Sequence, residues 1–332
     1  MPEVVSLATL DQRRLGEVRA LLDETGRADG RPPLAEPKHA QLRAGAGGWS
    51  GVLAYDGARL IGYAHVRWGP PGAGPRVQAE VVVHPDHRGD GLAGRLADGV
   101  RRTLAGEGGG VLYLWARRVA DPSATFAARL GMSVQRRLAF MARPLDAVPP
   151  APRLPGGVAL RTHRPGPDDA ELLRVNNAAF AGHPENGGWG PEELRRRRAL
   201  PWFDPAGLLL AWRGDGLVGF HWTKVAGDSE PTGEVYVLAV DPSARRLGLG
   251  RALLRAGLRH LHAQGCRRVV LYVDLADRPA VELYDAEGFT TRQVDVCYEQ
   301  RVEPAVASPD VGAPAPGQGR PRDPGDVSDC SL

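Results

Sequence analysis

The chain has 332 residues, of which 42% are hydrophobic and 24% charged, which is enough for packed cores and for about two domains at ~150 residues each. This composition excludes a disordered or fibrous protein. The net charge is only +3, so we expect no nucleic acid partner. No stretch approaches the ~18 consecutive apolar residues of a membrane span, so we expect no membrane partner either.

Cysteine usage and the N-terminus indicate the compartment. Cys266, Cys297 and Cys330 stand far apart, so they form neither a CxxC metal motif nor a disulfide framework, and we expect no metal. The N-terminus lacks the basic-then-apolar pattern of a secretion signal. We therefore predict a cytoplasmic protein, and we expect it to be a monomer.

Hydrophobic periodicity predicts the same order of elements in each half of the chain. An opening helix is followed by a hairpin, a strand, an arginine-glycine turn, a longer helix, another strand and a short helix. In the first half, the opening helix falls at 15–22 and the two hairpin strands at 51–55 and 60–66. The next strand falls at 79–83, the longer helix at 92–104 and the last strand at 111–115. In the second half these elements fall at 170–180, 208–212, 217–222, 235–240, 254–261 and 268–273, and the short helix at 279–287.

Two segments interrupt this order. Residues 143–157 are crowded with proline, which predicts a semi-rigid linker between domains at 1–142 and 158–302. From residue 303 to 332 large apolar residues almost disappear, and we predict a disordered tail because little burial can offset its ordering entropy.

The two halves repeat one unit. Arg88, Gly91 and Ala93 in the first half match Arg245, Gly248 and Gly250 in the second, each 157 residues later (245 − 88, 248 − 91, 250 − 93). In both halves the arginine follows a strand that ends in Val-His-Pro or Val-Asp-Pro and precedes a helix. Free backbone N–H groups and small residues at such a helix start form an anion-binding cradle.

Two phosphate-binding motifs fit this turn poorly. A Walker loop needs Gly-Lys-Ser/Thr, and no lysine is near, since Lys38 and Lys224 are the only lysines. A Rossmann fingerprint needs Gly or Ala three places after its second glycine, where this chain has Leu253.

The spacing R-x-x-G-x-G/A after a Val-x-Pro strand end resembles the acetyl-CoA diphosphate loop of the GNAT acetyltransferase superfamily. This resemblance implies a mixed α/β fold of two tandem GNAT domains, with acetyl-CoA as co-substrate and no metal. The run 279–289 resembles the family pattern A-x-x-L-Y-x-x-x-G-F, which gives Tyr284 the role of general acid beside the CoA sulfur.

Comparison of matching positions in the two halves indicates which half carries proton-transfer residues. Glu234 lies just before the strand that leads to the second cradle, where a carboxylate can deprotonate an ammonium. At the same separation of 157, the first half has Val77 for Glu234 and Ala127 for Tyr284. We therefore predict that the second half catalyses and that the first half is a reader or a scaffold, and the sequence leaves open whether the first half holds acetyl-CoA.

A more specific likeness covers the chain to about residue 299. The run 175–189, with Phe220–Lys224, Gly233–Val237 and Leu271–Asp274, resembles the mycothiol synthases, a tandem GNAT family of actinobacteria. The resemblance implies acetyl transfer to the cysteinyl amine of a cysteinyl-glucosaminyl-inositol, a small-molecule partner. It implies substrate contacts from five residues: Glu36, Glu185, Lys224, Glu234 and Tyr272.

The resemblance also implies three stretches of CoA contacts in the second half: Leu238, Ala239 and Val240; Arg245, Arg246, Leu247, Gly248, Leu249, Gly250 and Arg251; and Asp277, Arg278, Pro279, Ala280, Val281 and Glu282. The corresponding contacts of the first half are Val81, Val82, Val83, Arg88, Gly89, Asp90, Gly91, Leu92 and Ala93. One position departs from the family pattern, because Arg278 stands where an asparagine is usual.

Two alternatives stay open. The chain could acetylate another small amine, such as an aminoglycoside or a peptide N-terminus, or it could sense acetyl-CoA without catalysis. The run Arg195–Arg198 is interpreted as the solvated face of a helix. His183, His221 and Trp222 fit either a pocket lining or core packing.

Overall fold

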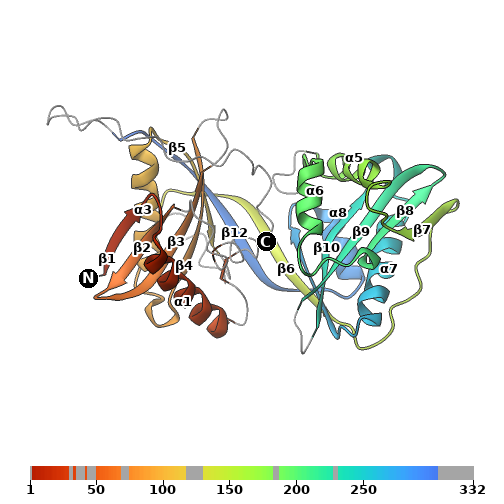
Figure 1. The fold of residues 1–332 in the computed structure, drawn as a ribbon, viewed down its shortest axis with the longest axis horizontal. Coiled ribbons are helices and arrows are strands. Elements are labelled where there is room, and N and C mark those ends of the chain that lie inside the picture. Colours follow the sequence, from red (N-terminus) through yellow and green to blue (C-terminus); the bar gives the residue numbers. More distant parts are fainter. Residues whose placement is uncertain are drawn as a thin grey trace. The chain divides into compact units, whose positions relative to one another are not determined.

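A computed structural model describes residues 2–29, 33–34, 42, 50–68, 75–116, 130–181, 187–226 and 231–305. It divides into two compact units, drawn in Figure 1: the described part of residues 1–137 and 294–332, and the described part of residues 138–293. This division differs from the boundaries at 142 and 158, because the last strand of each half belongs to the unit built by the other half.

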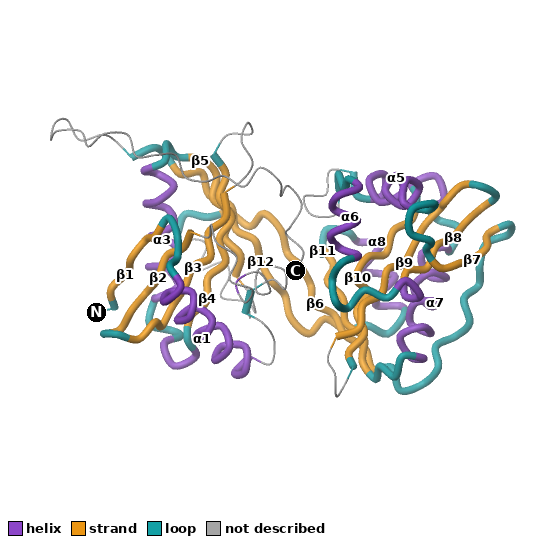
Figure 2. The backbone as a smooth tube through the Cα atoms, in the orientation of Figure 1, coloured by secondary structure: helices purple, strands orange, loops and turns teal. Residues whose placement is uncertain are grey.

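In its described residues, the first unit is a mixed sheet with the helices α1 and α3, and its strands are visible in Figure 2. The strand order is β1-β2-β3-β4-β5-β12, antiparallel throughout except for the parallel pair β4 and β5. In chain order its elements are β1 Glu3–Leu7, α1 Gln12–Asp29, β2 Ser50–Asp56, β3 Arg59–Trp68, β4 Arg76–Val83, η1 Pro85–His87, α3 Leu92–Gly106, β5 Gly110–Ala116 and β12 Thr290–Val302.

The second unit repeats this plan with strand order β6-β11-β10-β9-β8-β7, and its parallel pair is β10 and β11. Its elements are β6 Ser133–Pro144, β7 Val158–Thr162, α5 Asp169–Ala179, α6 Pro191–Arg198, η2 Pro205–Gly207, β8 Leu208–Arg213, β9 Gly216–Ala226, β10 Thr232–Val240, η3 Pro242–Ala244, α7 Leu249–Ala263, β11 Arg268–Asp274 and α8 Arg278–Ala286. Arg143 and Pro144 end β6, so the irregular connection begins two residues later than the proline pattern predicts.

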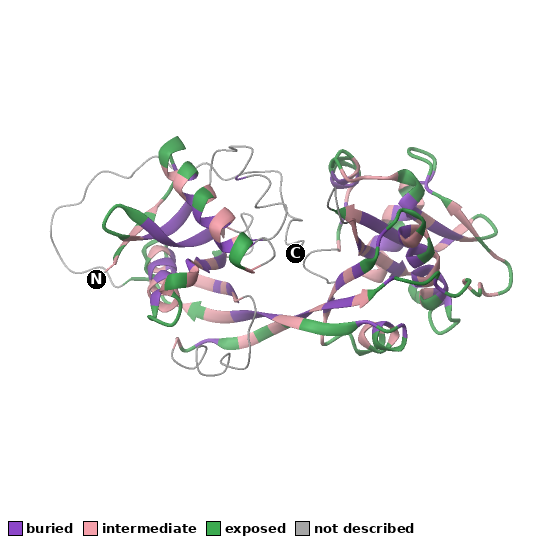
Figure 3. Cartoon of the chain, turned by 90° about the horizontal axis from the view of Figure 1, so that it is seen from below, coloured by how far each residue is buried: buried purple, intermediate pink, exposed green. Residues whose placement is uncertain are grey.

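The apolar periodicity of the two long helices explains their placement. Leu92, Leu96, Val100 and Leu104 of α3 recur every four residues and are all buried in one cluster with the first sheet. Leu254, Leu258 and Leu261 of α7, spaced four and three residues apart, are buried in one cluster of the second unit. Each fully buried leucine side chain stabilises the fold by roughly 1.5–3 kcal/mol. In Figure 3 the central strands are largely buried, and the exposed residues lie on helices, in turns and along parts of β6 and β12.

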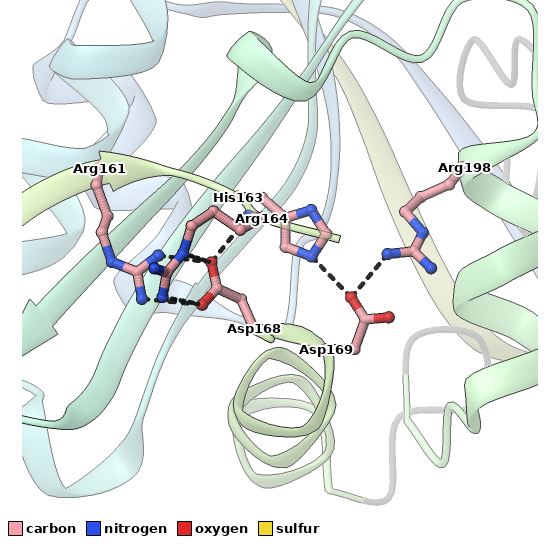
Figure 4. A network of polar contacts seen from close by, with 6 residues as sticks. All are labelled: Arg161, His163, Arg164, Asp168, Asp169 and Arg198. Carbon is pink, nitrogen blue, oxygen red and sulfur yellow. Dashed lines mark hydrogen bonds and ion pairs between the residues drawn. The ribbon is translucent and has the colours of Figure 1, made fainter. Parts of the chain in front are cut away.

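The other face of the second sheet is covered by α5 and α6, and ion pairs tie the start of α5 to β7 and the end of α6 to α5 (Figure 4). Asp168 accepts hydrogen bonds from Arg161 Nη1 at 2.6 Å and from Arg164 Nη2 at 3.0 Å. Burial opposes ionisation, yet these arginine hydrogen bonds hold the pKa of Asp168 well below its ordinary value. Asp169 Oδ1 accepts from Arg198 Nη1 at 2.7 Å and lies 2.9 Å from His163 Nε2. This network fixes both helices over β9 and β10.

Candidate active site

The predicted cradle of the second unit lies at the start of α7. Gly248 is the N-cap residue with φ 76°, and it provides no side-chain hydrogen bond to the first turn of the helix. A Cβ added at Gly248 meets nothing within 4 Å, and one at Gly250 meets only Leu283 at 3.6 Å and Val240 at 3.8 Å, which are ordinary contacts. The helix N-terminus is therefore open to a ligand, and uncapped N–H groups there favour an anion.

Arginines add positive charge to this cradle. Arg245 and Arg246 are exposed, and Arg246 has φ 64°, the left-handed conformation that costs a non-glycine residue about 1–2 kcal/mol. Gly89 has the matching position and conformation in the first unit, with φ 93°.

The parallel strands β10 and β11 part before β10 reaches the cradle. Their ladder joins Thr232 to Arg268 and ends with Glu234 opposite Val270, although the strands continue to Val240 and Asp274. In the first unit the ladder of β4 and β5 reaches two residues further, to Glu80 opposite Trp115. Because the strands part earlier in the second unit, Leu238–Val240 of β10 lie beyond the end of the ladder with β11.

A β-bulge follows Glu234 immediately. The register with β9 jumps from Val235 opposite Thr223 to Val237 opposite Trp222, so Tyr236 is the extra residue. Val235 packs with the α7 side of the sheet, whereas Tyr236 and Val237 both pack with the α5 side.

The bulge corrects the sequence-based equivalence. Arg67 lies opposite Gln78 in the first unit, and Lys224 lies opposite Glu234 in the second. Gln78, not Val77, is therefore the counterpart of Glu234, because a constant separation of 157 cannot account for the extra residue. The first unit still has no carboxylate at this position.

Glu234 and Lys224 meet on the α5 side of the sheet. Lys224 Nζ lies 3.2 Å from Glu234 Oε2, and the two side chains are only 4% and 14% exposed. Lys224 Nζ also lies 5.3 Å from the centre of the Trp202 ring, within cation–π range. The lysine is thus a buried group of the site, which its sequence position could not show.

Tyr272, on β11, packs against a residue that the sequence analysis missed. The ring of Phe140 on β6 lies 5.0 Å from that of Tyr272, and the two residues are paired across the strands. Phe140 belongs to the first half of the chain but completes the second unit. Only the long-range pairing of β6 with β11 reveals it, so no local signal could have found it.

The predicted general acid lies on α8. Tyr284 is 7% exposed and packs edge-to-face on Phe289, with ring centres 5.8 Å apart. Burial, with a further contribution from the charge of Asp277, raises the pKa of Tyr284 above its ordinary value of 10.0, so the phenol is protonated near neutral pH. Asp277 caps α8 by accepting from Ala280 N at 3.2 Å, and Arg278 is exposed beside it.

The arginine run on α6 is only partly a solvated face. Arg195 and Arg196 have side chains 66% and 41% exposed, as expected. The interpretation was wrong for Arg197, which is 5% exposed and paired with Glu193. His221 is fully buried, with Nδ1 2.9 Å from Leu253 O, and Trp222 packs in the aromatic cluster, so both belong to the core.

The cradle of the first unit differs in charge. Gly91 is again an N-cap residue in the left-handed conformation. Arg88, however, donates two hydrogen bonds of 2.9 Å to Asp29 of α1, whereas its counterpart Arg245 donates to the carbonyl of Ala179 at 3.3 Å. The Arg88 charge is therefore partly neutralised.

Some predicted positions lie outside the described residues, namely Glu36, Ala127, His183, Glu185, Cys330 and the tail from 306. Within the described ranges no group of three or more His, Cys, Asp or Glu residues could hold a metal ion, and no helix is long and apolar enough to cross a membrane. Burial raises the pKa of Cys266, which disfavours a thiolate there.

Comparison with known proteins identifies the family. The Acetyltransferase (GNAT) family matches residues 16–132 and 173–289, two segments whose bounds differ by 157 (173 − 16), as in the repeat found above. Its curated relatives include the mycothiol acetyltransferase of Thermobispora bispora, 48% identical over 85% of this chain and 95% of that protein. The chain belongs to the mycothiol acetyltransferase family of tandem GNAT proteins.

Other relatives agree with this assignment. The mycothiol acetyltransferase of Streptomyces coelicolor is 43% identical over 89% of this chain and 94% of that protein. Among solved structures, a GCN5-related N-acetyltransferase from Sphaerobacter thermophilus has a TM-score of 0.69 at 23% identity, covering 91% of this chain and 97% of that one. A tandem GNAT protein from the clavulanic acid pathway also scores 0.69, at 20% identity, with coverages of 92% and 100%.

These findings confirm the predicted α/β fold of two tandem GNAT domains and the predicted enzyme class, an acetyl-CoA-dependent N-acetyltransferase. A small-molecule acceptor follows from that class. The roles of individual residues are taken up next.

Proposed function

We propose that the protein acetylates the cysteinyl amine of a cysteinyl-glucosaminyl-inositol in the cytoplasm, yielding mycothiol and CoA. The structural observation that carries this proposal is the Lys224–Glu234 ion pair at the point where β10 and β11 part. The substrate class is supported by the relatives named mycothiol acetyltransferase.

The residues of the second cradle fit acetyl-CoA. The N–H groups at the start of α7, with Arg245 and Arg246, would hold the diphosphate, and Gly250 would let it approach the backbone. Main-chain groups of Leu238–Val240 would bind the pantetheine amides and the thioester carbonyl. Asp277–Glu282 at the start of α8 would flank the same ligand. We propose a second, weaker acetyl-CoA site at Val81–Val83 and Arg88–Ala93, weaker because Asp29 competes for Arg88.

The acceptor side would lie at Lys224, Glu234 and Tyr272. Carboxylates can accept from sugar hydroxyls or hold an ammonium, and the lysine and tyrosine can donate to ring oxygens. Phe140 would support Tyr272 from behind.

The proposed reaction is a direct attack in a ternary complex. Glu234 takes a proton from the ammonium, which leaves a neutral amine. The nitrogen forms a bond to the thioester carbonyl carbon, the carbon–sulfur bond breaks, and Tyr284 donates its proton to the departing thiolate. The acetylated nitrogen then gives up its surplus proton, which restores the Tyr284 phenol. The basicity required of Glu234 is modest, because an α-amino group has a pKa of ~7.7–8.0.

Incubation of the purified enzyme with acetyl-CoA and cysteinyl-glucosaminyl-inositol tests the proposal. The expected product carries one acetyl group on nitrogen, as determined by mass spectrometry after blocking of the substrate thiol. A polyamine, an aminoglycoside and a peptide serve as competing acceptors. Faster acetylation of any of these would refute the proposed substrate, and no acetylation of any acceptor would refute the activity.

A further inference from the structure

The β-bulge at Tyr236 is held by a buried arginine that the proposed chemistry does not use. Tyr236 is the extra residue of β10, two positions after Glu234, and an unpaired residue in a strand needs side-chain contacts to fix it. Its ring packs at 4.7 Å on Trp202 and at 5.5 Å on Trp222, and its hydroxyl accepts a hydrogen bond from Arg197 Nη1.

Arg197 is itself held on three sides. Its Nε donates to Glu193 Oε1, one turn earlier on α6, and its guanidinium lies 4.2 Å from the centre of the Trp189 ring. The side chains of Arg197 and Glu193 are 5% and 8% exposed. Such a buried pair contributes little net stability compared with an apolar pair of the same size. Its retention is better explained by the orientation that it imposes on Tyr236.

Tyr236 is linked to the ion pair of the active site through one indole. The Trp202 ring packs on the Tyr236 ring, and the centre of the Trp202 ring lies 5.3 Å from Lys224 Nζ. Lys224 in turn pairs with Glu234 at 3.2 Å. The contacts therefore run from Arg197 through Tyr236 and Trp202 to Lys224 and Glu234.

We propose that Arg197 is a positioning residue for the acetyl transfer. By binding the Tyr236 hydroxyl it fixes the bulge, and the bulge sets the direction of Glu234 and the place where β10 leaves β11. This inference rests on the proposed function of Glu234. It assigns to α6 a role in catalysis that requires no contact between Arg197 and either substrate.

Three variants test the inference: Tyr236→Phe removes only the hydroxyl, Arg197→Met removes the donor, and the double variant removes both. Arg195→Met is the matched control, since Arg195 is exposed on the same helix and pairs with Glu192. Each single variant should lower kcat/KM for the amine about 10- to 100-fold, because small displacements of reacting groups have effects of this size. The affinity for acetyl-CoA should change less than twofold.

The double variant should lose no more activity than Arg197→Met alone, because the two groups act through one hydrogen bond. Arg197→Lys should restore little, since lysine cannot reach Glu193, Trp189 and Tyr236 with one planar group. A merely structural arginine would lower the melting temperature and leave kcat/KM of Tyr236→Phe within twofold of wild type. That result, or losses that multiply in the double variant, would overturn the inference.

A second measurement separates this inference from the proposed function. Hydrogen exchange of the backbone amides of residues 235–238 should accelerate at least tenfold in Tyr236→Phe and stay unchanged in Arg195→Met. Exchange needs no substrate, so unchanged protection in Tyr236→Phe would refute the anchoring even in an enzyme that acetylates the amine. Conversely, a wild-type protein with no acetyltransferase activity would refute the proposed function alone.

Discussion

Lys224 and Glu234 lie directly opposite each other on β9 and β10 and form an ion pair of 3.2 Å, while the same two ladder positions of the first unit hold Arg67 and Gln78. The duplicated unit thus keeps a cation at one position and changes the carboxylate to an amide at the other. An amide cannot act as a base, so the proposed role of Glu234 cannot be filled by its counterpart in the first unit.

The first prediction concerns this carboxylate. Glu234→Gln converts the second unit to the pair found in the first, and kcat/KM for the amine should fall about 10²- to 10⁴-fold, the usual contribution of a general base. Initial rates with varied amine measure this loss, and isothermal titration should give an unchanged affinity for acetyl-CoA. Glu192→Gln, an exposed glutamate of α6, is the control and should retain full activity. Activity of Glu234→Gln within threefold of wild type would exclude the carboxylate as the base.

The second prediction concerns the leaving group. Tyr284→Phe keeps the packing against Phe289 but removes the proton donor, so kcat should fall about 10²-fold or more while the melting temperature shifts by only a few degrees. The raised pKa of Tyr284 keeps the phenol protonated, so the wild-type rate should show no decline below about pH 10 from loss of this proton. Stopped-flow measurements of CoA release at a series of pH values give kcat and its pH dependence. Equal rates for the variant and the wild type would assign the proton transfer to another group.

The third prediction tests the cradle without disturbing the protein. A methyl group at Gly250 meets only ordinary contacts at 3.6 and 3.8 Å, and alanine favours helix over glycine by about 1 kcal/mol, so Gly250→Ala should fold at least as stably as wild type. The same methyl group would hold a diphosphate away from the backbone, and we expect the KM for acetyl-CoA to rise at least tenfold. Gly16→Ala in α1, also with open space around it, is the control. An unchanged KM would mean that the diphosphate binds elsewhere.

A fourth prediction distinguishes the two cradles. Asp29→Asn removes the carboxylate that holds Arg88, so the first unit should bind acetyl-CoA more tightly while turnover by the second unit stays the same. Titration of acetyl-CoA into protein that also carries Gly250→Ala measures binding at the first cradle, because this substitution should weaken the second. If Asp29→Asn leaves binding in that background unchanged, Arg88 does not contact the ligand.

Local patterns in the sequence account for much of this site. The helices follow from apolar residues spaced three or four apart in α3 and α7, and the left-handed Gly91 and Gly248 follow from glycine at a helix start. Each of these features depends on residues close together in the chain.

Features that depend on distant residues could not be predicted in this way. The bulge at Tyr236 adds one residue to β10 without any change in composition. Because of this residue, a constant separation of 157 matched Glu234 to Val77, whereas the strand pairing matches it to Gln78. Phe140 reaches Tyr272 through a strand from the other half of the chain. Arg197 is the third of four identical residues, and only the packing of α6 on the sheet distinguishes it from its neighbours.

The last prediction concerns stability in acid. His221 is fully buried, and desolvation lowers its pKa to about 4 from 6.5, so the folded protein holds it neutral while the unfolded chain binds a proton below about pH 6.5. The unfolded state is therefore favoured progressively as the pH falls from about 6.5 to about 4, and this single group should reduce the free energy of unfolding by about 2 kcal/mol between pH 7 and pH 5. Urea titrations at the two pH values measure the loss.

His221→Asn keeps a donor toward Leu253 O but cannot titrate, so its loss over the same range should be smaller by that amount. His163, whose pKa burial also lowers, adds to the loss in both proteins and cancels in the comparison. Equal losses in the wild type and the variant would show that His221 accepts a proton in the folded state.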